Sequence, residues 1–166
     1  MMFGPITQLG YLTDDLDAAA AAWVRLGVGP FTKMAGVSMP AVMDGEAVDI
    51  KIDLALAYQG DVQIELIQPL CDSPSPYREN KLAGLWGSHH TQFTVDDLDA
   101  AIKLCEAAGM EMACEITSAG ARYIYMRGAA GWIELAMPNP GLEMFFGMIK
   151  KSSEDWDGKT VWNQTS

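Results

Sequence analysis

Four polar side chains in this chain have the residue types and the spacing that could hold a divalent metal ion. They are Gln8, Glu65, His90 and Glu134. A histidine nitrogen combined with carboxylate and amide oxygens suits zinc, or an ion such as nickel, cobalt, manganese or iron(II). An ion held in this way polarises the oxygens of a bound molecule, and a neighbouring carboxylate can then move a proton. The pattern therefore indicates metal-assisted acid–base chemistry.

Two internal repeats place the four residues in matching positions. The segment TQLGYLTDDLDAA, residues 7–19, returns as HHTQFTVDDLDAA, residues 89–101, so that Gln8 corresponds to His90 at an offset of 82 residues. The segment VQIELIQP, residues 62–69, returns as GWIELAMP, residues 131–138, so that Glu65 corresponds to Glu134 at an offset of 69 residues. Each half of the chain therefore supplies one polar residue from its first strand and one carboxylate from its last.

Alternation along the predicted strands gives these residues polar surroundings. His90 shares its strand face with Ser88, Gln92 and Thr94, which predicts a wet cavity on that side. Glu134 alternates with apolar neighbours, and burying a carboxylate there without a partner or an ion would be costly. We expect Gln92 or Ser88 to orient His90 through its other ring nitrogen. The structural alternative is a hydrogen-bonded histidine with solvated or paired carboxylates.

Each half of the chain reads as one strand, one helix and three strands. In the first half we expect a strand over residues 6–12, a helix capped by Asp14 and ended by Gly27, a short strand over 29–34, a loop over 38–46, and strands over 48–58 and 62–67. In the second half we expect a strand over 88–94, a helix from Asp97 to Gly109, and strands over 112–116, 121–127 and 132–137.

The predicted fold class is α+β, with two repeated βαβββ modules that form one cupped mixed sheet. The first module covers residues 1–69 and the second covers residues 88–138. A linker over residues 70–87 joins them, because this stretch is rich in proline, glycine and serine. Residues 139–166 form a C-terminal helix and tail.

Composition limits the partners of the protein. The net charge of −11 argues against nucleic acid and against an anionic membrane surface, because both require basic residues. No apolar run approaches the ~18 residues of a membrane-spanning helix, and the first residues lack the basic start and long apolar stretch of a signal peptide. With 3 cysteines and no CxxC pair, we expect reduced thiols in a cytoplasmic protein.

The repeated segments resemble those of the vicinal oxygen chelate superfamily, which includes glyoxalases, methylmalonyl-CoA epimerases and bleomycin resistance proteins. The resemblance covers residues 6–138 and lies in ITQLGYLTDDLDAAAAAW, VQIELIQP, GSHHTQFTVDDLDAA and GWIELAMP. It implies paired βαβββ modules forming a cup around a metal, with ligands on the first and last strands of each module. Carried over to this sequence, these ligands are Gln8, Glu65, His90 and Glu134. Glutamine at the first position departs from the histidine common in the group, although some glyoxalases share this ligand set.

The resemblance implies a metal-dependent isomerase, epimerase or lyase that transfers an α-proton on a metal-chelated, oxygenated small molecule. Zinc is the expected ion. Glu134 would move the proton together with Glu65 or with Asp53, which lies in IDLALA, a segment that resembles the strand carrying a second base in the epimerases. The alternative is a non-enzymatic protein that sequesters a hydrophobic small molecule. A third possibility, an extradiol-type oxygenase, is disfavoured by Gln8.

Three further groups of residues could shape the site or the assembly. Five methionines are candidates for an adaptable apolar lining: Met34, Met39, Met43, Met137 and Met144. A glutathione or CoA adduct would need cationic anchors, for which the candidates are Arg25, Arg78, Arg122 and Arg127. An apolar stripe predicts a homodimer interface, or alternatively a lid over the chain's own cup: Leu142, Phe145, Phe146 and Ile149.

Overall fold

Each half of the chain begins with the predicted strand and capped helix. In the computed structural model, which describes residues 3–163, β1 (Ile6–Leu12) leads into α1 (Leu16–Arg25), and β5 (Gly87–Thr94) leads into α3 (Leu98–Ala107). Asp97 caps α3 as expected, but α1 is capped by Asp15 and not by the predicted Asp14. Asp15 Oδ1 accepts a hydrogen bond from the Ala18 backbone N–H at 2.9 Å, the third helical position, and Asp14 precedes this capping position by one residue.

Three strands follow each helix and close with the first strands into a barrel. The first half contributes β2 (Thr32–Met43), β3 (Glu46–Gln59) and β4 (Val62–Pro69), and the second contributes β6 (Glu111–Ser118), β7 (Ala121–Gly128) and β8 (Gly131–Met137). The order around the barrel is β1-β4-β3-β2-β6-β7-β8-β5. The pairs β1/β4 and β5/β8 are parallel, and all other pairs are antiparallel. The α+β class and the cupped mixed sheet are thereby confirmed, while superposition of the halves as repeated modules stays a prediction.

The predicted loop over residues 38–46 is wrong, because most of it belongs to one long strand, β2. The tight turn is confined to Asp44 and Gly45, both of which have positive φ. Met39, Ala41 and Met43 are buried in alternation with exposed neighbours. Pro40 obscures this alternation in the sequence, since proline cannot donate to a strand ladder. It is exposed and lies just before the three β2 residues that pair with β6.

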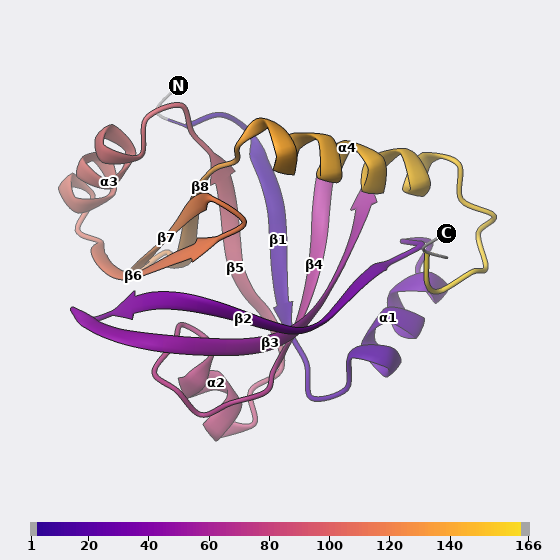
Figure 1. Ribbon diagram of the computed structural model, residues 1–166, viewed down its shortest axis with the longest axis horizontal. Coiled ribbons are helices and arrows are strands. Elements are labelled where there is room, and N and C mark those ends of the chain that lie inside the picture. The colour runs from indigo at the N-terminus through magenta and orange to yellow at the C-terminus, as the bar shows by residue number, and fades with distance from the viewer. Residues whose placement is uncertain (1–2, 164–166) are drawn as a thin grey trace.

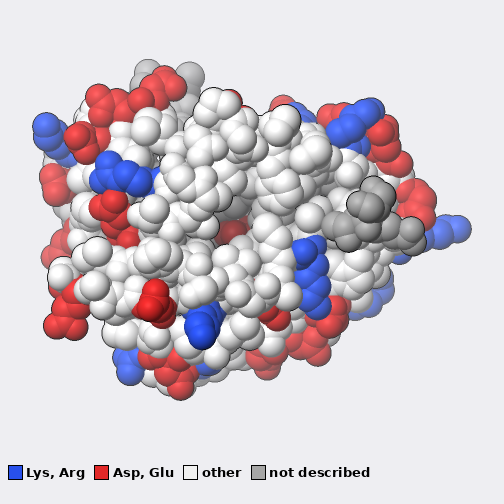
Figure 2. Space-filling view, viewed as in Figure 1, with Lys and Arg blue, Asp and Glu red and all other residues white. Residues whose placement is uncertain are grey.

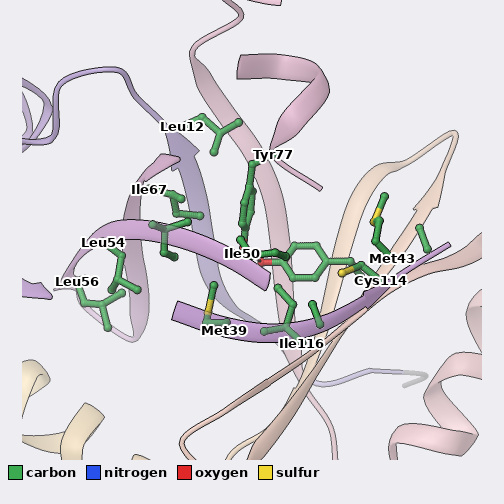
Figure 3. Packing of buried hydrophobic residues seen from close by; sticks show 14 of the residues in the cluster. Leu12, Met39, Met43, Ile50, Leu54, Leu56, Ile67, Tyr77, Cys114 and Ile116 are labelled. Atoms are coloured by element: carbon green, nitrogen blue, oxygen red, sulfur yellow. Dashed lines mark hydrogen bonds between the residues drawn. The ribbon is translucent and has the colours of Figure 1, made fainter. Parts of the chain in front are cut away.

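The predicted linker over residues 70–87 contains a short helix, α2 (Arg78–Ala83), and a deeply buried residue in front of it. Tyr77 is only 2% exposed. It packs in the same core cluster as Leu12 and Ile50, and Figure 3 shows its ring among these side chains. This segment therefore contributes an aromatic side chain to the barrel interior in addition to joining the two halves.

The last helix, α4 (Pro140–Glu154), runs across one end of the barrel (Figure 1). Its first turn is capped by Asn139, whose side-chain oxygen accepts from the Leu142 N–H at 3.0 Å. Ile149 is buried, and Phe145 and Phe146 pack against the barrel core. The apolar stripe of α4 therefore covers its own barrel, so the lid alternative is correct for this stripe. The homodimer stays a prediction, now without this surface as its support.

The chain returns to the barrel after α4. The backbone N–H of Phe31 donates to the Val161 carbonyl, and the N–H of Asn163 donates to the Phe31 carbonyl, each at 2.8 Å. Among the helices of residues 3–163, none is long and apolar enough to cross a membrane.

Candidate metal centre

Strand register brings the four predicted ligands together inside the barrel. Gln8 on β1 lies opposite Gln92 on β5, which in turn lies opposite Glu134 on β8. Glu65 on β4 and His90 on β5 both lie opposite a glycine of β1, Gly10. As a result, His90 Nε2 is 3.1 Å from Gln8 Oε1, 3.4 Å from Glu65 Oε2 and 3.3 Å from Glu134 Oε2.

Gly10 makes room for the ring of His90. A Cβ at this position would overlap Cε1, Nδ1 and Nε2 of His90. A glycine in a strand interior often marks such a close approach, and this signal was available in the sequence but was not used. Because Gly10 has no side chain, the His90 ring can lie over β1 and point toward both carboxylates.

The other ring nitrogen of His90 is held by His89, and not by the predicted Gln92 or Ser88. The two Nδ1 atoms are 3.1 Å apart, and His89 Nε2 is 2.9 Å from the carbonyl oxygen of Pro76. Regular strand alternation would point His89 away from His90. His89 instead occupies an irregularity in the β1/β5 register, between the pairs Gly10/His90 and Tyr11/Ser88, and such a bulge re-aims a side chain.

These contacts fix the tautomers of both rings. A carbonyl oxygen can only accept, so His89 carries its proton on Nε2 and accepts the Nδ1–H of His90 at its own Nδ1. Burial, reinforced by repulsion from His90, lowers the pKa of His89 to about 3, which keeps its ring neutral. Burial lowers the pKa of His90 as well, but the carboxylates of Glu134 and Glu65 outweigh this effect and raise it.

A chain of amides fixes which atom Gln8 presents to the centre. Glu134 Oε1 accepts from the amide nitrogen of Gln92 at 2.7 Å, and the same nitrogen donates to Gln8 Oε1 at 3.0 Å. The amide nitrogen of Gln8 donates to Gln63 Oε1 at 2.6 Å, and Gln63 donates to the Tyr58 hydroxyl at 3.1 Å. Because a carboxylate only accepts, it orients every amide in this chain. Gln8 therefore directs its oxygen, the atom that binds metals, toward His90.

The residues present fit a divalent cation. With its Nδ1 proton committed to His89, His90 faces three accepting oxygens through Nε2 alone, so this position calls for positive charge. Either a second proton on Nε2 or a metal ion can supply it. Distances of 3.1–3.4 Å from Nε2 to the oxygens suit ligands that share one ion at ~2.0–2.2 Å. The charges of Glu65 and Glu134 would balance that of a divalent ion.

Two tyrosines that the sequence analysis did not assign to the centre lie beside it. The hydroxyls of Tyr77 and Tyr125 are 2.9 Å apart and buried. Burial raises the pKa of both well above the usual range, so both remain protonated donors. Tyr125 lies opposite Glu134 across the β7/β8 pair. Burial raises the pKa of Glu134, although His90 and the hydrogen bonds from Tyr125 and Gln92 oppose the shift.

The structure does not bring Asp53 to this centre. Asp53 Oδ1 accepts from the Gly36 backbone N–H at 2.6 Å on the outer face of β3. Its strand neighbours Ile52 and Leu54 point into the barrel. Ala55 and Ala57, whose small size suggested room for a substrate, pack in one cluster with residues of α1. Helix α1 therefore packs on the face of β3 that carries Ala55 and Ala57, which is also the face of Asp53.

The centre forms one end of a cavity of about 120 Å³. Apolar walls complete it: Met34, Val37, Met39, Ile52, Leu54, Leu56, Ile116 and Phe146. Of the five predicted methionines, two therefore line the cavity, whereas Met43 is in the core and Met137 and Met144 are exposed. Figure 2 shows a hollow below α4 with acidic atoms at its floor and mostly uncharged residues around it.

An eight-stranded mixed barrel with an inward-facing cluster of histidine and carboxylates is the architecture of the glyoxalase fold. The family model of the Glyoxalase/Bleomycin resistance protein/Dioxygenase superfamily matches residues 7–126. The chain belongs to this superfamily, which confirms the resemblance seen in the sequence.

Solved structures with the same fold share little sequence with the chain. Methylmalonyl-CoA epimerase from Mycobacterium tuberculosis is 21% identical, with a TM-score of 0.60 over 86% of this chain and 93% of its own. A hypothetical protein from Bacillus halodurans is 19% identical, with a TM-score of 0.57 over 81% and 94%. A Streptomyces coelicolor methylmalonyl-CoA epimerase variant in complex with 2-nitronate-propionyl-CoA is 16% identical, with a TM-score of 0.56 over 83% and 96%. The comparison with curated proteins found no match.

Proposed function

We propose that this protein is a metal-dependent enzyme of the isomerase, epimerase or lyase type that moves an α-proton on an oxygenated small molecule. The observation that carries the proposal is the arrangement around His90 Nε2. A neutral neighbour fixes its tautomer, and the free nitrogen faces the oxygens of Gln8, Glu65 and Glu134 at 3.1–3.4 Å. A purely structural histidine would more simply donate to one acceptor.

The four residues would hold one divalent ion, for which we propose zinc. The halves of the chain, residues 1–69 and 88–138, would act as two modules that supply two ligands each. When bound, the ion would polarise the substrate's oxygens and stabilise negative charge that develops on them. His89 and Gln92 would keep His90 and Gln8 in their binding orientations.

Glu65 and Glu134 would handle the proton, in place of the pair with Asp53. They approach the centre from different strands, β4 and β8, which are separated around the barrel by β1 and β5. Both side chains line the cavity, so both can reach a molecule bound there. One carboxylate would remove the proton next to a carbonyl, and the other would return a proton from the opposite side. This division of roles is what an epimerase requires.

The apolar walls favour one competing function, the sequestration of a hydrophobic molecule without chemistry. Such a protein needs the walls but neither the ion nor the proton transfer. Metal analysis of purified protein and solvent deuterium exchange separate the two functions. The enzyme should hold close to one equivalent of metal and should catalyse deuterium incorporation next to the carbonyl of a bound hydroxyketone in D₂O. Binding of such a molecule with no metal and no exchange would establish the sequestering function instead.

A further inference from the structure

The cavity at the metal centre has no basic residue in its lining. Within residues 3–163, its charged lining residues are the carboxylates Glu65 and Glu134. The other polar lining groups are amides and hydroxyls, and the remaining walls are apolar. An anionic substrate, whether a carboxylate or a phosphate, would therefore find no lysine or arginine inside.

The arginines predicted as anchors for a glutathione or CoA adduct are absent from the cavity lining of the described residues. Arg122 Nε pairs with Glu115 at 2.6 Å, and Arg127 pairs with Asp44 at 3.0 Å. Arg78 donates to the carbonyl of Asp72 at 3.0 Å, and Arg25 is exposed at the end of α1.

Lysines near the cavity are also paired. Lys150 lines an adjoining recess, and its ammonium group pairs with Asp61. The recess shares four lining residues with the cavity: Gln63, Gln92, Tyr123 and Phe146. Lys33, next to the lining residue Met34, pairs with Asp17 at 3.0 Å. Each of these two lysines thus already has a carboxylate beside it.

Charge balance leads to the same conclusion. A divalent ion held by two carboxylates gives a centre with no surplus positive charge, since Gln8 and neutral His90 add none. A bound anion would then place an uncompensated charge between apolar walls, and its partial burial there is unfavourable. An uncharged molecule avoids this cost and gains from contact with the apolar walls.

The cavity is also small. Its volume of about 120 Å³ is well below the ~300 Å³ at which sites for drug-sized ligands begin. Phe146 of α4 forms part of its wall, so the helix limits the length of a molecule that fits. A bulky group would have to remain outside.

We infer that the substrate is a compact, uncharged molecule that carries two adjacent oxygen functions on an apolar body, such as a hydroxyketone. This inference rests on the proposed function, since the two oxygens would face the metal centre. It sets the chain apart from the structurally similar epimerases, which are described as methylmalonyl-CoA enzymes. A CoA thioester with a free carboxylate has the charge that this cavity does not neutralise.

A matched pair of probes tests the inference. 2-Hydroxyacetophenone and phenylglyoxylate both have a phenyl ring and two adjacent oxygen functions, but only the second is an anion. Calorimetric titration of the zinc-loaded protein should give at least tenfold tighter binding of 2-hydroxyacetophenone. Methylmalonyl-CoA should bind more weakly than 2-hydroxyacetophenone as well. Equal or tighter binding of phenylglyoxylate or methylmalonyl-CoA would overturn the inference about the substrate and leave the metalloenzyme proposal standing.

Two further measurements separate this inference from the proposed function. Zinc titration without any probe tests the metal centre alone, and absence of zinc binding would overturn the proposed function. Titration of the metal-free protein with the same two probes tests the lining alone. A preference for the uncharged probe there supports the lining argument even if the metal fails, and a preference for the anion overturns it.

A variant that adds a cation to the lining sharpens the test. Met34 is half-buried on β2, so a lysine at this position can keep its stem against the wall. Met34→Lys should shift the ratio of the two affinities at least tenfold toward phenylglyoxylate. Met144→Lys is the matched control, because Met144 is 67% exposed on α4 and outside the cavity. An unchanged ratio in folded Met34→Lys protein, checked by circular dichroism, would contradict the inference.

Discussion

The two halves of the barrel surround their carboxylates differently. In the second half, Gln92 lies opposite Glu134 and donates a hydrogen bond to it at 2.7 Å. In the first half the corresponding position is Gly10, which lies opposite Glu65 and offers no side chain. The Glu134 side chain is accordingly only 4% exposed, whereas that of Glu65 is 14% exposed.

The difference between Gly10 and Gln92 at matching positions also explains why an imidazole ring fits into only one half. Gln8 meets Gln92 across the β1/β5 pair, and His90 meets Gly10. The amide of Gln92 holds Gln8, and the missing side chain of Gly10 admits the imidazole. One pair of matching positions, Gly10 and Gln92, thus gives the halves different tasks. The first half holds its carboxylate loosely, and the second holds its carboxylate firmly and supplies the nitrogen.

Removal of the His90 imidazole should have the largest effect on the difference between the two halves. We expect His90→Ala to abolish zinc binding at micromolar protein concentration. The variant would keep three oxygen ligands but lose the imidazole nitrogen of the proposed set. Elemental analysis after dialysis measures the result, with the wild-type protein treated in parallel. Retention of one equivalent of zinc by the variant would contradict both the centre and its asymmetry.

The two carboxylates should differ when each is made neutral. We expect Glu134→Gln to lower turnover by about 10²–10⁴-fold, as loss of a general base does, and to lower zinc content less than turnover. Glu65→Gln should lower turnover similarly but lower zinc affinity less than Glu134→Gln does, because Glu65 is the more exposed ligand. Turnover and zinc titrations on both variants give the comparison. Equal zinc affinities would show that the difference in burial has no effect on binding.

Gly10 should tolerate no side chain. We expect Gly10→Ala to displace the His90 ring, weaken zinc binding by about 10–100-fold, as a disturbed ligand orientation does, and lower the free energy of unfolding by about 1–3 kcal/mol through overpacking. Gly4→Ala is the matched control, because a Cβ there meets nothing within 4 Å. Zinc calorimetry and urea unfolding measure both effects. Wild-type zinc affinity in Gly10→Ala would refute the steric argument.

Removal of the amide at Gln92 should have the smallest effect of this set. Gln92→Ala frees Glu134 and Gln8 from their shared donor and makes the second half resemble the first. We expect zinc affinity to fall by about tenfold, at the lower end of the range for residues that orient ligands. Thr94→Ala on the same strand is the control, since the Thr94 hydroxyl donates to Thr7 and to none of the four candidate ligands within residues 3–163. Tighter zinc binding in Gln92→Ala would mean that the amide restrains rather than supports the centre.

Sequence alone predicted the location of the centre better than its details. The two repeat offsets selected Gln8, Glu65, His90 and Glu134, and the strand register brings these four together. The residue that holds the other ring nitrogen of His90 could not be predicted, because alternation assumes a regular strand and His89 lies in a bulge.

Two other errors have different physical causes. Residues on both faces of β3 are covered, one face lining the cavity and the other packing with α1, so alternation could not reveal which face lines the cavity. Tyr77 lies in an irregular segment without any periodic pattern, and its burial depends on tertiary contacts alone. Strand alternation thus failed where both faces of a strand are covered, and it gave no information where the backbone is irregular.

The chain returns to Phe31 after α4, so the segments that cover the barrel are synthesised late. Asn163 bonds Thr32, a partner 131 positions earlier, and the backbone around Phe31 pairs with the same late segment. On the ribosome, all eight strands are therefore made before α4 and before the residues that fasten the start of β2. The four candidate ligand residues are thus synthesised before the helix that covers one end of the barrel. The cover over this end of the barrel thus depends on segments that follow every strand in the chain.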